Sequence, residues 1–134
     1  VSERYLKEHG ITHAARILGT ASVGGVPAES PRGAMRTADV LLKRIGLTYE
    51  DLSAVEFNEA FAVIDVLFDR RYPELKDIYN TFGGALAYGH PYGASGAILL
   101  LHLLKALESR GGGRGVLSIA GAGGMGEAIG VELI

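Results

Sequence analysis

The chain has 134 residues, the length of one ordinary domain and enough to bury an apolar core, so we expect a single domain over residues 1–134. Thirteen basic and fifteen acidic side chains give a formal net charge of −2 with no basic stretch, which excludes the charge pattern of a nucleic-acid-binding protein. The absence of cysteine excludes disulfides, thiolate metal sites and a thiol nucleophile within these residues.

No segment of the sequence has the pattern of a membrane span or a secretory signal. The longest apolar stretch, residues 97–104, is interrupted by His102 and is too short to cross a bilayer. No charged segment followed by an apolar core opens the chain. We therefore expect a cytoplasmic protein without a membrane partner. The first residue, Val1 instead of methionine, suggests processing, a cloned fragment or a trimmed subunit.

The predicted elements of the first half alternate between helix and strand. We expect a short charged helix over residues 1–10 and a strand over residues 15–23, where apolar and β-branched residues dominate. A loop rich in glycine and proline follows at 24–33. Between 37 and 45 the apolar residues recur at helical spacing, and Gly46 stands where a left-handed C-cap would lie.

The second half continues this alternation. Its predicted elements are a strand at 54–57, a helix at 60–68, a short strand at 77–79, a helix at 97–107 and strands at 115–120 and 127–134. The helix at 97–107 is apolar almost all round, the pattern of a helix buried on every side. Strands that alternate with helices predict a three-layer α-β-α fold with a five-stranded mixed sheet. The last strand, reached by a short glycine turn, should run antiparallel.

Glycine gathers around His90. The chain holds twenty glycines, about twice the usual share of roughly 7%, and the passage 80–96 reads NTFGGALAYGHPYGASG. Glycines let the backbone close around the imidazole, Pro91 stiffens the exit, and Ser95 lies near the start of the apolar helix. Such a histidine serves as a general base or as a donor to an oxyanion. A glycine-rich turn with a solvent-exposed histidine explains the spacing equally well.

This passage resembles the thiolase pattern N-x-x-G-G-x-[apolar]-[small]-x-G-H-P-x-G-x-S-G at every defining position, and residues 58–61 resemble the N-E-A-F box of the same superfamily. The resemblance covers essentially the whole chain and implies the C-terminal half of a thiolase-like enzyme. It implies that His90 activates a nucleophilic cysteine and donates to the thioester oxygen. It also implies that Asn58 holds a water molecule that completes this oxyanion hole. From the residues alone, Asn58 suits a helix cap better.

The resemblance also names the expected coenzyme A contacts. Ala60 and Phe61 correspond to residues that line the pantetheine tunnel of thiolases, next to His90. As bare sequence they are the apolar face of a helix. Tyr88 and Tyr92 flank His90 where thiolases commonly carry aliphatic residues, so the acyl pocket can differ in shape.

The glycine cluster at 121–126 has two interpretations. It satisfies G-x-G-x-x-G after a predicted strand, but no second strand with an acidic residue follows for a dinucleotide site, and no Gly-Lys-Ser/Thr follows for a phosphate loop. The C-x-G-G-G-x-G turn of thiolases fits better. It puts Ala120 at the position of the family's acid/base cysteine and Ala122 at the backbone N–H of the second oxyanion hole. A methyl group cannot move a proton, and Ser118, on the same strand face, is a poor replacement because a hydroxyl lacks the acidity of a thiol.

No metal and no permanently bound cofactor is expected. The other histidines, His9, His13 and His102, have no partners at metal-ligand spacing, and the acidic residues form no pair at one site. The substrate that the resemblance implies is a coenzyme A thioester.

Two functions remain open. The first is the C-terminal half, or a separate small subunit, of a thiolase-type acyltransferase of the kind used in fatty acid metabolism. It would be inactive alone, because both catalytic cysteines are missing, and complete only with an N-terminal half in the same longer chain or as a partner subunit. The all-apolar helix predicts an exposed patch that drives association, and we expect an oligomer.

The second possible function is that of a non-catalytic domain that binds acyl-CoA or a protein partner. An intermediate case keeps acyl transfer or hydrolysis without carbon–carbon bond formation.

Overall fold

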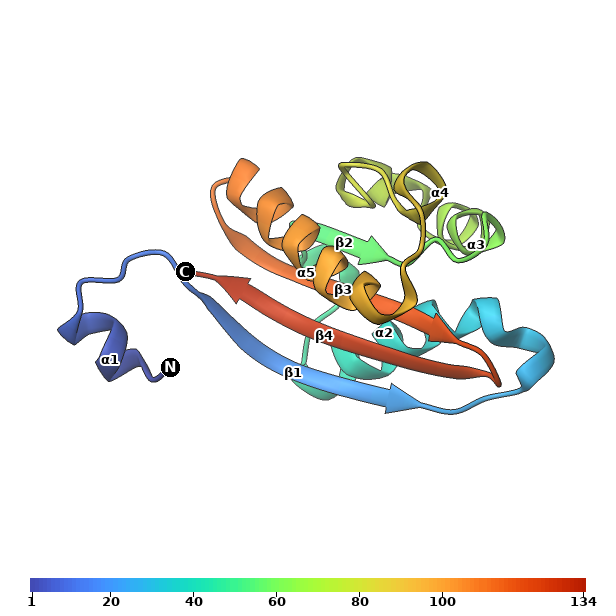
Figure 1. Ribbon diagram of the computed structural model, residues 1–134, viewed down its shortest axis with the longest axis horizontal. Coiled ribbons are helices and arrows are strands. Elements are labelled where there is room, and N and C mark those ends of the chain that lie inside the picture. Colours follow the sequence, from blue (N-terminus) through green and yellow to red (C-terminus); the bar gives the residue numbers. More distant parts are fainter.

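A four-stranded mixed sheet forms the centre of the computed structural model, which describes residues 1–134 (Figure 1). Its strands are β1 (Ala15–Val23), β2 (Ala54–Phe57), β3 (Gly113–Gly121) and β4 (Met125–Leu133). They lie in the order β1-β4-β3-β2, with β2 parallel to β3 and β4 antiparallel to both of its neighbours. The predicted antiparallel direction of the last strand is confirmed.

The predicted fifth strand at 77–79 is wrong. Pro73–Ile78 form a 3-10 helix, η3, and Tyr79 makes only an isolated bridge to Val55. Proline fixes φ near the helical value and lacks an N–H for a sheet, which favours the 3-10 turn. Asn80 then takes a left-handed conformation with φ 42°, so the extended chain cannot continue.

Helices cover both faces of the sheet. Helix α2 (Gly33–Ile45) packs against β1, β3 and β4 on one face, and α5 (Tyr92–Ser109) packs against β2 and β3 on the other. The shorter elements are α1 (Glu3–Glu8), η1 (Pro27–Arg32), η2 (Tyr49–Asp51), α3 (Val63–Arg71) and α4 (Ala85–Tyr88). In Figure 1, α3 and α4 lie together beyond the β2 edge of the sheet, and a loop leads from α4 down to the start of α5. The predicted three layers are present.

The two covering helices bury their apolar residues differently. In α2 the buried residues Ala34, Ala38 and Leu41 recur at helical spacing, and Gly46 ends the helix with φ 73°, as predicted. In α5, Leu103 is fully buried against the sheet, whereas Leu101 on the outer side is 63% exposed. Within this chain only one side of the helix meets the sheet, and the exposed Leu101 lies on the apolar side that the sequence predicts to be uncovered in the lone domain. No helix of the structure combines the length and apolar character needed to cross a membrane.

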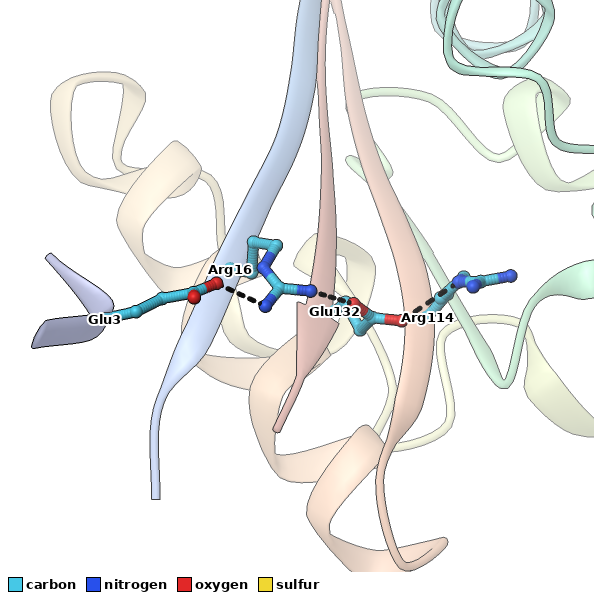
Figure 2. Close-up of polar contacts among 4 residues, drawn as sticks. All are labelled: Glu3, Arg16, Arg114 and Glu132. Atoms are coloured by element: carbon cyan, nitrogen blue, oxygen red, sulfur yellow. Dashed lines mark hydrogen bonds and ion pairs between the residues drawn. The ribbon is translucent and has the colours of Figure 1, made fainter. Parts of the chain in front are cut away.

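Charged side chains connect the N-terminal segment to one end of the sheet. Figure 2 shows Arg16 of β1 between two carboxylates: its Nη2 lies 2.6 Å from Oε1 of Glu3 in α1, and its Nη1 lies 2.9 Å from Oε2 of Glu132 in β4. The Nε of Arg114 in β3 lies 3.1 Å from the other oxygen of Glu132. Helix α1 has no buried residue and stands clear of the sheet in Figure 1, so these exposed pairs are weak attachments.

Candidate active site

The predicted site residues converge at the carboxyl ends of the parallel strands β2 and β3. Asn58 directly follows β2, Ala120 lies at the end of β3, and His90 precedes α5. A largely apolar cavity of about 600 Å³ opens here, and it is lined by Ser30, Pro31, Ala60, Phe61, His90, Tyr92, Ile119, Ala120, Gly121 and Ala122. Ligands of open α/β sheets bind outside the carboxyl ends of the strands, so this is the expected place for a site.

Both ring nitrogens of His90 have partners. Nδ1 lies 2.7 Å from Oγ of Ser95, and Nε2 lies 3.3 Å from Nδ2 of Asn58. The Ser95 hydroxyl also donates to the carbonyl oxygen of Pro91 at 3.2 Å. Because the Asn58 amide nitrogen only donates and Ser95 has a single proton, the consistent network puts the imidazole proton on Nδ1, donated to Ser95. Nε2 is then unprotonated: its lone pair accepts the long bond from Asn58 and can act as a general base when a substrate proton replaces that donor.

Asn58 is part of this network and not a helix cap. The residue is 1% exposed, and its amide reaches the imidazole directly. Helix α3 begins later, at Val63, and its N-cap residue Ala62 makes no side-chain capping bond. The capping interpretation of Asn58 is therefore wrong.

Two further residues, Glu59 and Asn80, fasten the His90 loop to β2. The Asn80 side chain accepts from the N–H of Phe57 at 2.9 Å and donates to the carbonyl of Phe57 at 3.1 Å. It also donates to Oε1 of Glu59 at 3.0 Å, while Oε2 of Glu59 accepts the N–H of Leu86 in α4 at 3.0 Å. A Cβ atom at Gly84 would overlap the Glu59 carboxyl group, which explains a glycine there. We call Glu59, Asn80 and their bonds the Glu59 clamp. Sequence reasoning missed the clamp, although both of its residues belong to the quoted motifs.

The two tyrosines that flank His90 in sequence differ in position. The Tyr92 ring lies edge-on to the imidazole, with ring centroids 4.8 Å apart, and Tyr92 is 86% exposed at the cavity. Tyr88 instead packs edge-on to His102, at 5.1 Å, and does not line the cavity. Phe61 borders the cavity with 61% of its surface exposed, so two aromatic rings are available to an apolar ligand.

The glycine cluster forms a hairpin turn between β3 and β4. Gly123 and Gly124 have φ values of 81° and 83°, as a tight hairpin turn requires. Ser30 accepts the N–H of Gly124 at 3.1 Å, and Arg36 donates to the carbonyl of Gly124 at 2.8 Å. A strand and not a helix follows the turn, which contradicts a dinucleotide-binding loop.

Residues 11–133 match the family described as thiolase, C-terminal domain. The chain belongs to this family. It is 38% identical over 135 residues to the beta-ketoadipyl-CoA thiolase of Pseudomonas knackmussii, a match that covers 99% of this chain and 34% of that protein. It is also 38% identical over 120 residues to the acetyl-CoA acetyltransferase of Synechocystis sp., covering 90% and 30% of the two chains.

Solved structures agree with this assignment. Human mitochondrial 3-ketoacyl-CoA thiolase superposes with a TM-score of 0.90 at 36% identity, over 100% of this chain and 34% of that one. The acetyl-CoA acetyltransferase of Bacillus anthracis gives a TM-score of 0.91 at 30% identity, with the same coverage. This thiolase C-terminal domain thus spans about a third of the length of the relatives it matches.

In this thiolase C-terminal domain, the cavity offers few groups that can move a proton. Ala120 contributes a methyl group, and His90 and Tyr92 are the only ionisable residues of the lining. Ser118 cannot replace a base at Ala120, because its buried hydroxyl bonds to the carbonyls of Ala34, at 2.8 Å, and Glu127, at 3.0 Å. No group of three or more histidine, aspartate or glutamate side chains is placed to hold a metal ion.

Proposed function

We propose that this chain is the C-terminal half of a thiolase-type acyltransferase that acts on acyl-CoA thioesters. The observation that carries the proposal is the His90 network. An imidazole with an unprotonated Nε2 lies beside a buried amide, at a cavity lined by Ala60, Phe61 and Ala122. Membership of the thiolase family supplies the reaction class.

The reaction we propose uses His90 as base and acid in turn. Nε2 takes the proton of a cysteine thiol supplied by the N-terminal half, and the thiolate attacks the thioester carbonyl. The bond from the acyl carbon to the coenzyme A sulfur then breaks, and the proton held by His90 passes to that sulfur. A water molecule held by the Asn58 amide, and the backbone N–H of Ala122, would be the donors for the oxyanions of such steps. Ala60 and Phe61 would contact the pantetheine arm.

Carbon–carbon bond formation needs a second proton transfer, at the α-carbon of an acyl group. Among the cavity residues of this chain, the imidazole is already engaged with the nucleophile, and Ala120 has no proton to exchange. We therefore propose that a complex built on this chain transfers acyl groups to thiols or water and does not condense two acyl groups. A domain that binds acyl-CoA without turnover is the second candidate, favoured by the methyl group of Ala120 at the expected place of the proton carrier.

The partner that we propose is a thiolase N-terminal half, in the same longer chain or as a separate subunit. The relatives extend well beyond the third that this chain matches. Leu101 is exposed on the outer side of α5, with Leu100 and Leu104 half-buried beside it. An apolar helix side of this kind is stabilised when another domain covers it.

A complementation assay tests the proposal. The first two-thirds of a relative, such as the 38% identical beta-ketoadipyl-CoA thiolase, would be co-purified with this chain, and release of free coenzyme A from acetyl-CoA would be followed. His90→Ala should lower the rate by about 10²-fold or more, the usual contribution of a general base. His9→Ala, a change on the exposed end of α1, is the matched control. Coenzyme A binding without thiol release would favour the binding domain, and full activity of His90→Ala would refute the assigned role.

A further inference from the structure

Glu56 is a buried carboxyl group that the proposed reaction does not use. It lies in β2 with 0% of its surface exposed, and neither carboxyl oxygen has a hydrogen-bond partner. Its neighbours Val55 and Phe57 pack in the cluster that contains α2 and α3, whereas Ala54 packs against α5. Because side chains alternate along a strand, Glu56 faces the α5 side of the sheet.

No positively charged side chain is placed to compensate the negative charge of an ionised Glu56. The groups that face it are the Glu59 carboxylate beyond the end of β2, the hydroxyls of Tyr79 and Tyr88, and the N–H of Thr81, which makes no hydrogen bond of normal geometry to it.

Two groups further out complete these surroundings. Asp65 of α3 is bonded to the Tyr79 hydroxyl at 2.7 Å, and His102 of α5 packs against Tyr88, with its Nδ1 buried and unpartnered. None of these groups is a lysine or arginine. Burial, together with the charge of Glu59, raises the pKa of Glu56 to about 8.

The Glu59 clamp connects this buried group to His90. Glu59 holds Asn80 with one oxygen and the N–H of Leu86 with the other. Gly84 lies so close to the Glu59 carboxylate that an added Cβ atom would overlap it, so the carboxylate is packed against the backbone of the loop. Helix α4 ends at Tyr88, and the chain passes through Gly89, with φ 96°, directly into His90. A negative charge on Glu56 would therefore act on the group that anchors the His90 loop.

We propose that Glu56 is a positioning residue for His90: its protonated carboxyl lets the Glu59 clamp hold residues 80–90 in place, and loss of that proton releases them. In water-poor surroundings without a cation, two neighbouring carboxylates repel strongly, and breaking the clamp lets Glu59 reach solvent. The inference rests on the proposed function only in naming His90 as the catalytic base. The loop itself can be observed without any turnover.

Amide hydrogen exchange of the 134-residue chain, measured at pH 6.5 and 9.0 and corrected for the intrinsic exchange rates, tests whether loss of the Glu56 proton releases residues 80–90. The probes are Leu86, bonded to Glu59, and Gly89, whose N–H bonds to Ala85 at 2.8 Å. The held form loses the Glu56 proton with a pKa of about 8 and the released form loses it at an ordinary, lower pKa. Between pH 6.5 and 9.0, protection at both probes should therefore fall by about 30-fold. Glu56→Gln cannot ionise and should keep its protection. Glu74→Gln, an exposed position in η3, should behave like the unaltered chain.

Unchanged protection of the unaltered chain at pH 9.0, or an equal loss in Glu56→Gln, would overturn the proposal. If Glu56→Gln does not fold, carbon-13 NMR of labelled glutamate carboxyls in the unaltered chain decides. The Glu56 resonance and the Leu86 and Gly89 amides should titrate with one midpoint, and separate midpoints would refute the coupling. Neither measurement depends on acyl transfer, so failure of the proposed function leaves a different signature.

Discussion

At the scale of single residues, the methyl group of Ala120 lines the same cavity as the imidazole of His90, and the proposed alignment puts Ala120 at the position of an acid/base cysteine. In a complex with an N-terminal half, Ala120→Cys would add the missing proton carrier. Condensation of acetyl-CoA to acetoacetyl-CoA should then rise by about 10²-fold or more over the unaltered complex, because a positioned acid/base group contributes that much. The absorbance of acetoacetyl-CoA measures this gain.

Ser118→Cys is the control for that change. Its side chain contacts the carbonyl of Ala34 in α2 and lies outside the cavity lining, so a thiol there should not support condensation. If Ala120→Cys gave no gain while the complex still transferred acyl groups, the alignment of the glycine turn would be wrong.

Sequence motifs picked out residues that line the cavity, but not the residues that hold them in place. His90 and Ala120 come from two separate motifs and line one cavity, and their chemical roles stay predictions. The hydrogen bond of Asn80 to Glu59 joins residues separated by 21 positions. It can form only when the end of β2 and the glycine-rich loop lie side by side in the fold. A motif names residues of a suitable chemical type, whereas hydrogen bonds between distant segments depend on the fold.

At the scale of elements, the end of α2 rests on the left-handed conformation of Gly46, with φ 73°. Gly46→Ala forces an L side chain into that conformation and should lower the free energy of unfolding by about 1 kcal/mol. Urea denaturation followed by circular dichroism measures the loss. Gly24→Ala is the control, since Gly24 has no positive φ and its added methyl group meets nothing within 4 Å. An equal loss in both variants would refute the capping argument.

Element prediction failed where local pattern and tertiary context disagreed. The passage at 77–79 has few residues with which to extend a strand, and the conformations of Pro73 and Asn80 on either side reduced it to one bridge at Tyr79. In α5 the pattern succeeded, because a helix that is apolar on all sides cannot be covered by one small domain, and Leu101 is exposed as expected.

At the scale of the whole molecule, the chain matches about a third of the length of its relatives, and the outer side of α5 is apolar. Leu101→Glu should leave folding almost unchanged, because the side chain is already 63% exposed. It should weaken binding to an N-terminal half by 100-fold or more, since burying an unpaired carboxylate at an apolar interface costs about 3 kcal/mol or more. Titration calorimetry with the first two-thirds of a relative gives the affinity, and thermal melting by circular dichroism checks the fold. Val66→Glu, on the exposed side of α3, introduces the same charge and should change the affinity far less. Equal binding by Leu101→Glu and the unaltered chain would mean that the N-terminal half docks on another surface, and the apolar side of α5 would then need a different partner.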